Sequence, residues 1–456
     1  MNSKLFGTSG MRGIPNVDFT PELVMKLGLA LANLTHGNRI AIGFDTRLTS
    51  SFMNCLLSAG MLVGGAEVRN FGLIPTPVLA FLTSNTNCRA GAMITASHNP
   101  LEYNGVKIFD GDGMAFSHTL EKKVEDLMAF NNLHRVDSKS IGNVKRINCV
   151  DKYTEMVKES LTLKRKWSVV IDPGCGAAYS IGPSLFRELG CRVLTINAQP
   201  DGFFPGRPPE PTLESLHLLS KMVKETGANA GVAYDGDADR MALIDENGRF
   251  VSMDQLIAAY GARLLSLKNK KRIVVPIDAS MCIEESIEAV GGNVIRTAVG
   301  DVNVAESIVE NNATFGAEAS GAWINPDYSL CPDGILSSLL VISEITGQRG
   351  NPTLSKFVSL ASRYPILRKK INCPRKLHSE VIEKLQSELF NLMPGKSNVQ
   401  TIDGIRVTSK KEWILVRPSG TEPVLRITVE SKSTKNAESL MKEVIKIIEN
   451  IIIKLS

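Results

Sequence analysis

A serine that could serve as a nucleophile stands at the end of a short apolar run, in the stretch MITASHNPLEYNG (93–105). The run has the composition of a β-strand, and Asn99 and Pro100 force the chain to turn directly after Ser97. The serine is therefore expected at the carboxyl end of a buried strand, with a plain surface turn as the competing interpretation. His98 adjoins it, but neighbouring side chains diverge, so no serine–histidine dyad is predicted.

Three aspartates in YDGDADRMALID (234–245) have the spacing of a cation site. Asp235, Asp237 and Asp239 alternate with small residues, so in a turn or extended segment their carboxylates point toward one place. Three such charges repel one another, and a divalent cation that prefers oxygen ligands, such as Mg²⁺, relieves that repulsion. An EF-hand loop is a poor alternative because Arg240 stands where the sharp turn needs glycine. A solvated acidic turn without metal is the simpler alternative.

Two alternating apolar runs flank the loop RPSGTEP (417–423), which is rich in groups that bind phosphate. Backbone N–H groups, hydroxyls and guanidinium groups are offered by Arg417, Ser419, Gly420, Thr421 and Arg426. A simple hairpin turn is the competing interpretation. No Walker A sequence occurs, so a nucleotide-binding P-loop is not indicated.

Other polar residues in loops of small residues could belong to the same site. Glu318 and Ser320, in FGAEASGAW, could accept from and donate to a polyhydroxyl ligand if that segment is extended. Lys107 follows the serine along the chain and could return to the same cleft, and Arg12 stands in the glycine loop FGTSGMRG. A lone glutamate in a loop is usually solvated, so these residues indicate a binding site only when they are taken together.

The elements that must position these residues alternate between strands and helices. Short β-rich runs that end in aspartate and a turn recur at 41–46, 168–174, 230–237 and 273–280. Helix-like stretches lie between or before them, for example at 20–34, 183–190 and 214–227. This alternation predicts an α/β fold with largely parallel sheets, whose ligands lie beyond the carboxyl ends of the strands. Any one of these aspartates could instead be an ordinary cap or turn residue.

Composition shifts divide the 456 residues into four expected domains, at 1–150, 151–250, 251–366 and 367–456. A charged helical stretch at 151–167 follows the first domain, and the stretch 362–376 has the character of a hinge. The last domain is expected to hold a helix and strands at 405–408, 413–417 and 424–430. It should end in an amphipathic helix with the apolar face Leu440, Met441, Val444, Ile445, Ile447, Ile448 and Ile451.

Bulk composition narrows the class of protein. Hydrophobic residues make up 43% and charged residues 22% of the chain, as in ordinary globular proteins. The net charge of +5 is small and spread along the chain, which disfavours nucleic acid as a partner. The 8 cysteines form no CxxC pair, no secretory signal is visible, and no apolar run reaches the length of a membrane span. A reduced, cytoplasmic protein is expected.

Taken together, TASHNP, DGDADR, the Glu-x-Ser-Gly loop and RPSGTEP resemble, in this order, the four signatures of the α-D-phosphohexomutase superfamily. FGTSGMRG and RPPEP (207–211) fit the same family, and the resemblance extends from residue 6 to residue 430. It implies three similar α/β domains with mixed, largely parallel sheets and a smaller C-terminal α+β domain around a central cleft. It also implies an isomerase that moves a phosphoryl group between O6 and O1 of a hexose phosphate, through a phosphoserine and a bisphosphorylated sugar.

The resemblance further implies a role for each motif. Ser97 would carry the phosphoryl group, and its phosphate would share one Mg²⁺ per active site with Asp235, Asp237 and Asp239. The remaining catalytic positions would be Arg12, Lys107 and Arg240. Sugar hydroxyls would be held by Glu318 and Ser320, and the substrate's own phosphate by Arg417, Ser419, Gly420, Thr421 and Arg426. Phosphoryl transfer needs positioning and charge neutralisation more than covalent assistance, and these groups supply both.

One position departs from the family pattern. Many members carry a histidine after the Glu-x-Ser-Gly stretch, where this chain has Ala322 and Trp323. Lys107 then becomes the expected proton-transfer group, with an amine pKa lowered by nearby cations. The same departure favours conversion of glucosamine 6-phosphate to glucosamine 1-phosphate, with a phosphomannomutase or phosphoglucomutase as the alternative.

Two other classes of function stay open. A serine-dependent sugar phosphatase would use the same serine and metal, whereas a non-enzymatic, metal-stabilised binding protein would not need the serine. The expected partners are a hexose phosphate and its bisphosphate, without nucleic acid or membrane. The expected assembly is a monomer or a homodimer.

Overall fold

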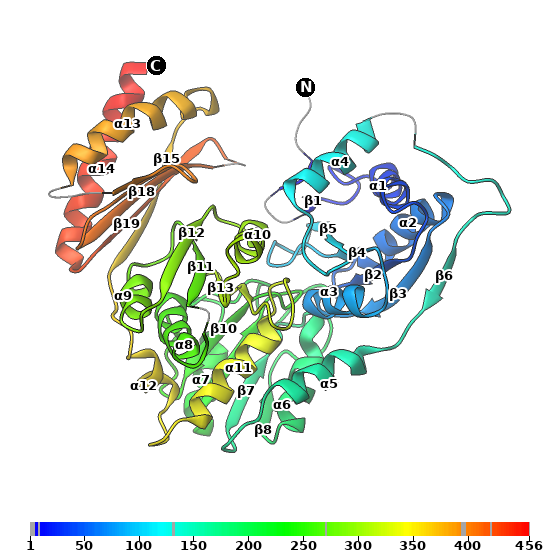
Figure 1. The fold of residues 1–456 in the computed structure, drawn as a ribbon, viewed down its shortest axis with the longest axis horizontal. Coiled ribbons are helices and arrows are strands. Elements are labelled where there is room, and N and C mark those ends of the chain that lie inside the picture. Colours follow the sequence, from blue (N-terminus) through cyan, green and yellow to red (C-terminus); the bar gives the residue numbers. More distant parts are fainter. Residues whose placement is uncertain are drawn as a thin grey trace. The chain divides into compact units, whose positions relative to one another are not determined.

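The computed structural model describes residues 5–7, 10–129, 133–269, 271–393, 398–419 and 422–455. The chain forms two compact units. The first unit contains residues 1–253 and 300–358, and the second contains residues 254–299 and 359–456. The predicted fold class is confirmed, because mixed, mostly parallel α/β sheets are followed by an antiparallel C-terminal sheet (Figure 1).

The first sheet of the first unit has six strands with a parallel centre. In sheet order they are β1 (Met11–Gly13), β5 (Asn104–Asp110), β4 (Ala90–Ile94), β2 (Ile40–Phe44), β3 (Glu67–Leu73) and β6 (Asn143–Arg146). The antiparallel pairs β4–β5 and β1–β5 bring the motifs at residues 12, 97 and 107 to neighbouring strands. The helices are α1 (Pro21–Leu34), α2 (Ser50–Val63), α3 (Thr76–Asn85) and α4 (His118–Ala129).

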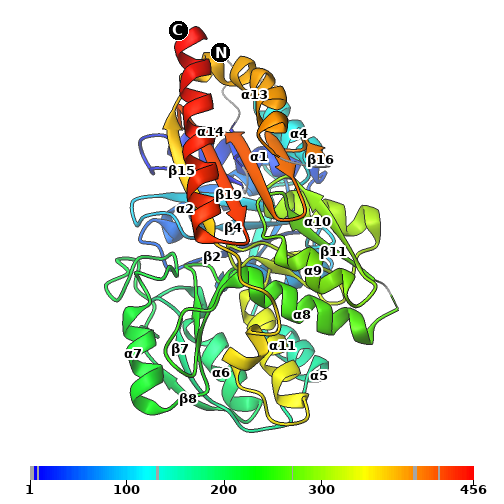
Figure 2. The same ribbon diagram turned by 90° about the vertical axis from the view of Figure 1, so that its left-hand side faces the viewer.

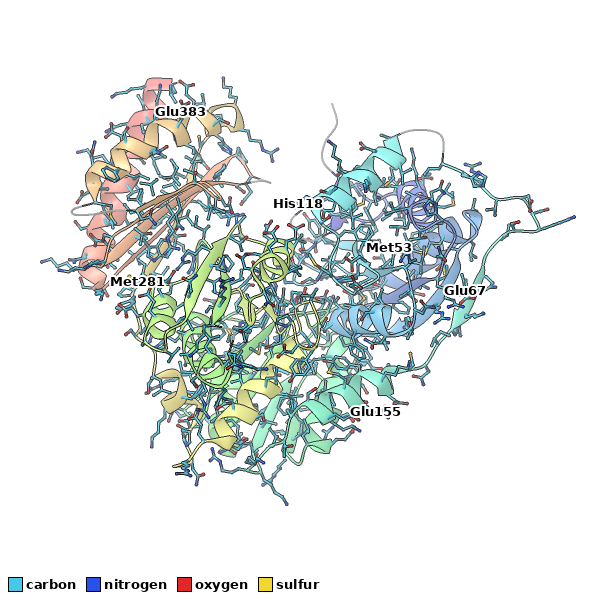
Figure 3. The ribbon with its side chains drawn as sticks, in the orientation of Figure 1. Met53, Glu67, His118, Glu155, Met281 and Glu383 are labelled. Carbon is cyan, nitrogen blue, oxygen red and sulfur yellow. The ribbon has the colours of Figure 1, made fainter. Side chains whose placement is uncertain are left out.

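Helix α1 begins as its sequence predicts. The side chain of Thr20 accepts the Leu23 N–H at 3.3 Å, and Pro21 occupies the first helical position. The apolar interior beside this sheet includes Leu27 of α1 and Met53 of α2, the latter labelled in Figure 3. The strands that carry the chemistry are thus fixed by an ordinary apolar core.

The second sheet of the first unit holds the acidic motif between two of its strands. Its order is β10 (Met241–Asp245), β9 (Ala230–Tyr234), β7 (Ser168–Asp172) and β8 (Arg192–Thr195), with β9–β7 and β7–β8 parallel. Its helices are α5 (Val150–Ser160), η1 (Ala177–Tyr179), α6 (Ile181–Glu188) and α7 (His217–Thr226). The predicted helix at 151–167 ends early, at Ser160, whereas α7 ends at Thr226 and is capped by Gly227 in the left-handed conformation that glycine favours.

The rest of the first unit supplies a hairpin and three helices. These elements are α10 (Asp301–Asn311), β13 (Phe315–Ala317), β14 (Trp323–Ile324), α11 (Gly334–Gly347) and α12 (Leu354–Val358). Asp333 caps α11 by accepting the Leu336 N–H at 2.9 Å, and it also accepts the buried Tyr153 hydroxyl at 2.8 Å. This helix is thereby tied to α5 of the second sheet.

The second unit combines a parallel strand pair with an antiparallel sheet. The pair is β11 (Arg272–Pro276) and β12 (Asn293–Thr297), accompanied by α8 (Met253–Leu267) and α9 (Cys282–Glu288). The sheet order is β15 (Ile366–Asn372), β19 (Val424–Ser431), β18 (Glu412–Pro418), β17 (Ile405–Thr408) and β16 (Asn398–Gln400). Its helices are η2 (Arg375–Leu377), α13 (His378–Leu392) and α14 (Thr434–Leu455), the last drawn in red in Figure 2.

The predicted strands and the terminal helix of the C-terminal region form, but the predicted hinge does not. The three expected strands correspond to β17, β18 and β19, and α14 buries Leu440, Met441, Val444, Ile448 and Ile451. The stretch 362–376 was expected to be a hinge, but it contains β15, which pairs with β19 over seven residues. Among the described residues, the helices lack the combination of length and apolar character that a membrane crossing requires.

Candidate active site

Ser97 occupies a tight turn immediately after β4. Its backbone is in the left-handed region, with φ 51°, which is rare for a residue other than glycine. The side chain is buried, and its Oγ donates to Asp235 Oδ2 at 2.6 Å. The Ser97 N–H donates to Thr95 Oγ1 at 2.8 Å. The serine and the acidic loop, predicted from separate motifs, therefore lie in direct contact.

The position of His98 differs from the prediction that its side chain diverges from that of Ser97. Its Nδ1 lies 3.2 Å from Ser97 Oγ, although the two side chains were expected to diverge. The expectation assumed extended backbone, and the positive φ at Ser97 changes the direction of the serine side chain. Burial, with Arg240 and Arg12 nearby, lowers the pKa of His98 to about 2. The imidazole is therefore uncharged at neutral pH.

The acidic loop joins β9 and β10, which are antiparallel strands, so the helices of an EF-hand are absent from its flanks. Asp235, Asp237 and Asp239 are all buried, and one carboxylate oxygen of each lies within 4.8 Å of the others. Burial, reinforced by the charges of Asp239 and Asp237, raises the pKa of Asp235 well above its usual range.

Two oxygens of this loop fit a bound cation. Asp237 Oδ1 and Asp239 Oδ1 are buried without a hydrogen-bond partner among the described residues. A buried carboxylate oxygen without a donor is costly, and coordination of a divalent cation would remove that cost. The opposite oxygen of Asp237 is occupied, because it accepts Thr76 Oγ1 at 2.6 Å and Lys107 Nζ at 2.8 Å. The donor set therefore suits one metal ion of the kind that prefers oxygen ligands.

Three cationic side chains surround the serine and the aspartates. Lys107, on β5, pairs with both Asp237 and Asp239. Arg12, on β1, donates from Nη1 to Asn99 Oδ1 at 2.6 Å, which places it beside the Ser97 turn. Arg240 Nε lies 3.9 Å from Asp239 Oδ1. These cations can offset the charge of a phosphate held at this turn.

The pKa of Lys107 differs from the sequence prediction. Burial by itself lowers an amine pKa, but the carboxylates of Asp237 and Asp239 outweigh burial here and raise the pKa of Lys107. The prediction that neighbouring cations lower it is therefore wrong for this arrangement. Lys107 is protonated at neutral pH and holds a proton close to the acidic loop.

The turn at Ser97 and the acidic loop approach each other at Gly236. A Cβ on Gly236 would lie 2.6 Å from the Ser97 carbonyl oxygen, well inside van der Waals contact. Only glycine fits there without moving one of the two loops.

Gly236→Ala is expected to impair activity because its methyl group pushes the two loops apart. We expect kcat to fall by about tenfold or more and stability to fall by about 1–3 kcal/mol. Gly347→Ala is the control, since a Cβ at this exposed end of α11 meets no atom of the described residues within 4 Å. Steady-state kinetics and thermal unfolding of both variants measure the effect, and a native kcat for Gly236→Ala would contradict it.

Glu318 and Ser320 lie in the hairpin turn between β13 and β14, and not in the extended segment that was expected. Ser320 Oγ donates to Glu318 Oε2 at 3.0 Å, and Gly300 N–H donates to Glu318 Oε1 at 2.8 Å. The Met241 N–H donates to the Gly321 carbonyl at 3.2 Å, so this turn adjoins the acidic loop.

Ala322 and Trp323 stand where many members of the resembling family carry a histidine. The Trp323 side chain is fully buried and packs edge-on against Phe315, with ring centroids 5.1 Å apart. The indole belongs to the interior, so its position gives no support to the preference for glucosamine drawn from this dipeptide.

The phosphate-loop residues lie in the second unit. Arg417 and Arg426 are cross-strand neighbours on β18 and β19, and each of these like charges is offset by a carboxylate of its own. Arg417 Nη2 lies 3.1 Å from Asp403 Oδ2, and Arg426 Nη2 lies 3.3 Å from Glu422 Oε2. Ser419 Oγ accepts the Glu422 N–H at 3.2 Å. The predicted members Gly420 and Thr421 lie outside the described residues.

The site in the first unit also contains residues that no motif indicated. Thr76, Asp301 and Cys331 line a cavity of about 10 Å³ together with Lys107 and Asp239. The carboxylate of Asp301 interacts electrostatically with Lys107, Arg240 and Arg12. These residues come from three separate parts of the chain, and their neighbours in the sequence have no pattern that marks them.

Comparison with known proteins gives matches along almost the whole chain. Models of phosphoglucomutase/phosphomannomutase α/β/α domains I, II and III match residues 3–134, 151–248 and 252–364, and a model of the C-terminal domain matches residues 370–447. A probable phosphoglucosamine mutase of Methanothermobacter thermautotrophicus is 42% identical over 98% of both chains. Another, of Pyrococcus abyssi, is 41% identical over 99% of both chains.

Solved structures show the same fold. A phosphoglucomutase/phosphomannomutase family protein of Burkholderia thailandensis aligns with a TM-score of 0.89 at 22% identity, over 99% of this chain and 98% of the other. A putative phosphomannomutase of Thermus thermophilus aligns with a TM-score of 0.82 at 25% identity, over 98% and 100%.

Proposed function

Since the chain belongs to the phosphoglucomutase/phosphomannomutase family and is a phosphohexomutase, we propose that it converts glucosamine 6-phosphate to glucosamine 1-phosphate. The sugar is proposed because chains 42% and 41% identical over their full lengths are probable phosphoglucosamine mutases. Ser97 is proposed as the phosphoryl carrier. The observation that supports it best is the 2.6 Å hydrogen bond from its Oγ to Asp235, which joins the serine to the acidic loop.

In the proposed first step, the phosphate of phosphorylated Ser97 passes to O1 of glucosamine 6-phosphate. The P–Oγ bond of the serine breaks as the P–O1 bond forms, giving the 1,6-bisphosphate. The proton released by O1 ends on the departing serine oxygen, and we propose that Lys107 passes it on; because its pKa is raised, it gives up its proton only as it takes the one from O1. The bisphosphate then turns over, and its 6-phosphate returns to Ser97.

The side chains around Ser97 are proposed to stabilise charge through this exchange. Arg12 and Arg240 lie beside the serine turn and the acidic loop, where the transferring phosphoryl group carries its negative charge. A divalent cation held by Asp235, Asp237 and Asp239, for which we propose Mg²⁺, supplies further charge neutralisation when bound.

The remaining predicted residues are proposed to bind the substrate away from the reacting oxygen. Glu318 and Ser320 would hydrogen-bond sugar hydroxyls, and Arg417, Ser419 and Arg426 would bind the phosphate that is not transferred. Binding energy from such remote groups can orient the reacting hydroxyl. We also propose that the chain divides into four domains with boundaries at residues 150, 250 and 366.

The sugar preference is tested by assaying glucosamine, mannose and glucose 6-phosphates side by side with the Ser97-phosphorylated protein. We expect kcat/KM for glucosamine 6-phosphate to exceed the values for mannose and glucose 6-phosphates by about tenfold or more. A sugar without the amino group would leave polar groups of the site without a hydrogen-bond partner. A higher value for mannose 6-phosphate would overturn the sugar assignment but leave the mutase intact. Release of inorganic phosphate, measured in the same reactions, should be slow; release as fast as sugar turnover would indicate a phosphatase.

A further inference from the structure

A buried aspartate–arginine pair follows β2, in the strand–aspartate pattern that recurs along the chain. Arg47 has a fully buried side chain, and its Nε lies 3.2 Å from Asp45 Oδ2. Asp45 also accepts the Thr95 hydroxyl and the Ser50 hydroxyl, both at 2.7 Å. Both residues contact the serine turn: Asp45 through the hydroxyl of Thr95, and Arg47 through the carbonyl of Ser97.

The guanidinium group of Arg47 donates to four carbonyl oxygens of the segment that contains Ser97. Nη2 donates to the carbonyls of Ser97 at 2.8 Å and Asn99 at 2.6 Å. Nη1 donates to the carbonyls of Pro100 at 2.7 Å and Tyr103 at 2.8 Å. One rigid, planar group therefore fixes the backbone from Ser97 to Tyr103, which a flexible ammonium group could not do.

A second pair of the same kind holds the acidic loop. Arg207 Nε lies 3.1 Å from Asp172 Oδ2, at the end of β7, and both side chains are buried. Arg207 Nη2 donates to the carbonyl of Tyr234 at 2.6 Å, and Tyr234 directly precedes Asp235. The segment that carries Arg207 also contacts the first pair. The ring centroid of Phe204, three residues before Arg207, lies 5.4 Å from the Arg47 guanidinium carbon.

We propose that Arg47 and Arg207 are positioning residues for the phosphoryl transfer, each holding through backbone carbonyls the loop that carries Ser97 or the three aspartates. The proposal rests on the proposed role of Ser97. Its physical reason is the strained backbone at Ser97, whose φ of 51° persists only if the surroundings enforce it. A shift of the serine oxygen by about 1 Å can lower the rate by about 10²-fold, so holding this backbone in place helps to maintain the rate of transfer.

The test compares Arg47→Lys with Arg165→Lys. Arg165 also donates to backbone carbonyls, those of Ile345, Thr346 and Pro352, but this segment carries no residue of the site. Each protein is treated with glucose 1,6-bisphosphate, and the rate at which phosphate appears on Ser97 is followed by intact mass. Steady-state kcat and KM with glucosamine 6-phosphate are measured below the unfolding temperature of each variant.

Arg47→Lys is expected to lower the rate of Ser97 phosphorylation and kcat together, by about 10–10²-fold, with KM changed less than about threefold. Arg165→Lys should leave all three near native, even if it unfolds at a lower temperature. A folded Arg47→Lys that is phosphorylated at the native rate overturns the proposal. If Arg47→Lys does not fold, Arg207→Lys and Asp45→Asn are measured in the same way, and native rates in both overturn it. Wild-type protein that takes up no phosphate would refute the proposed function, a separate outcome.

Discussion

Ser97→Ala should abolish mutase activity, with kcat reduced on the order of 10⁴-fold or more, because the proposed covalent carrier is lost. The hydroxyls of Thr95 and Thr76 already donate to Asp45 and Asp237. Alanine keeps the Cβ and the backbone geometry of serine, so the strain at this turn is unchanged. The variant should therefore fold and fail at the chemical step.

The stability of Ser97→Ala separates this explanation from unfolding. The substitution removes one hydrogen bond to Asp235, worth about 0.5–1.5 kcal/mol, so only a small change in unfolding temperature is expected. The control is Ser58→Ala, because Ser58 is a buried serine of α2 whose hydroxyl has no partner among the described residues. Intact mass should show a phosphate adduct on the wild type and on Ser58→Ala only. Turnover by Ser97→Ala within tenfold of native would refute the serine mechanism.

Asp237→Asn should be the next most damaging change. The amide keeps the volume of the carboxylate but removes one of the three charges that attract a cation, at a residue whose Oδ1 lacks a donor. We expect Mg²⁺ affinity to fall by about 10–10²-fold and kcat by about 10²–10³-fold at a fixed Mg²⁺ concentration. Part of the kcat loss should be recovered by raising the Mg²⁺ concentration.

A thermal measurement tests metal binding without using activity. A ligand that binds only the folded protein stabilises it by about 2.7 kcal/mol at a concentration of 100 Kd. Mg²⁺ should therefore raise the unfolding temperature of the wild type, and EDTA should reverse the rise. Asp137→Asn, in an exposed turn of the first unit, should keep the full rise. An Asp237→Asn protein with a native Mg²⁺-dependent rise would show that the acidic loop is not the metal site.

The parts of the site that sequence reasoning predicted are the parts encoded within a few residues. Asp235, Asp237 and Asp239 share one tight loop, so their spacing alone implied that their carboxylates converge. The apolar run before Ser97 likewise implied a strand followed by a turn, as β4 shows. Strand and helix types followed from periodicity for the same reason.

Long-range contacts and backbone angles account for what was missed. Thr76 reaches Asp237 across 161 residues, and no local pattern around a threonine announces such a partner. The closeness of His98 to Ser97 depends on one backbone angle, which residue types do not specify at a non-glycine position. The direction in which the pKa of Lys107 shifts could not be inferred from the sequence. It depends on which charges are nearest, and these are carboxylates from the loop of another sheet.

The cross-strand pairing of Arg417 with Arg426 has a practical consequence for kinetic measurements. Each arginine has a carboxylate partner, Asp403 or Glu422, and a small doubly charged anion would compete with these carboxylates for the two guanidinium groups. If Arg417 and Arg426 bind the substrate's phosphate as proposed, phosphate and sulfate buffers compete with the sugar phosphate and inflate an apparent KM. Kinetic work on this enzyme is better done in buffers whose anions are monovalent and bulky, with the inorganic phosphate of each substrate stock measured beforehand.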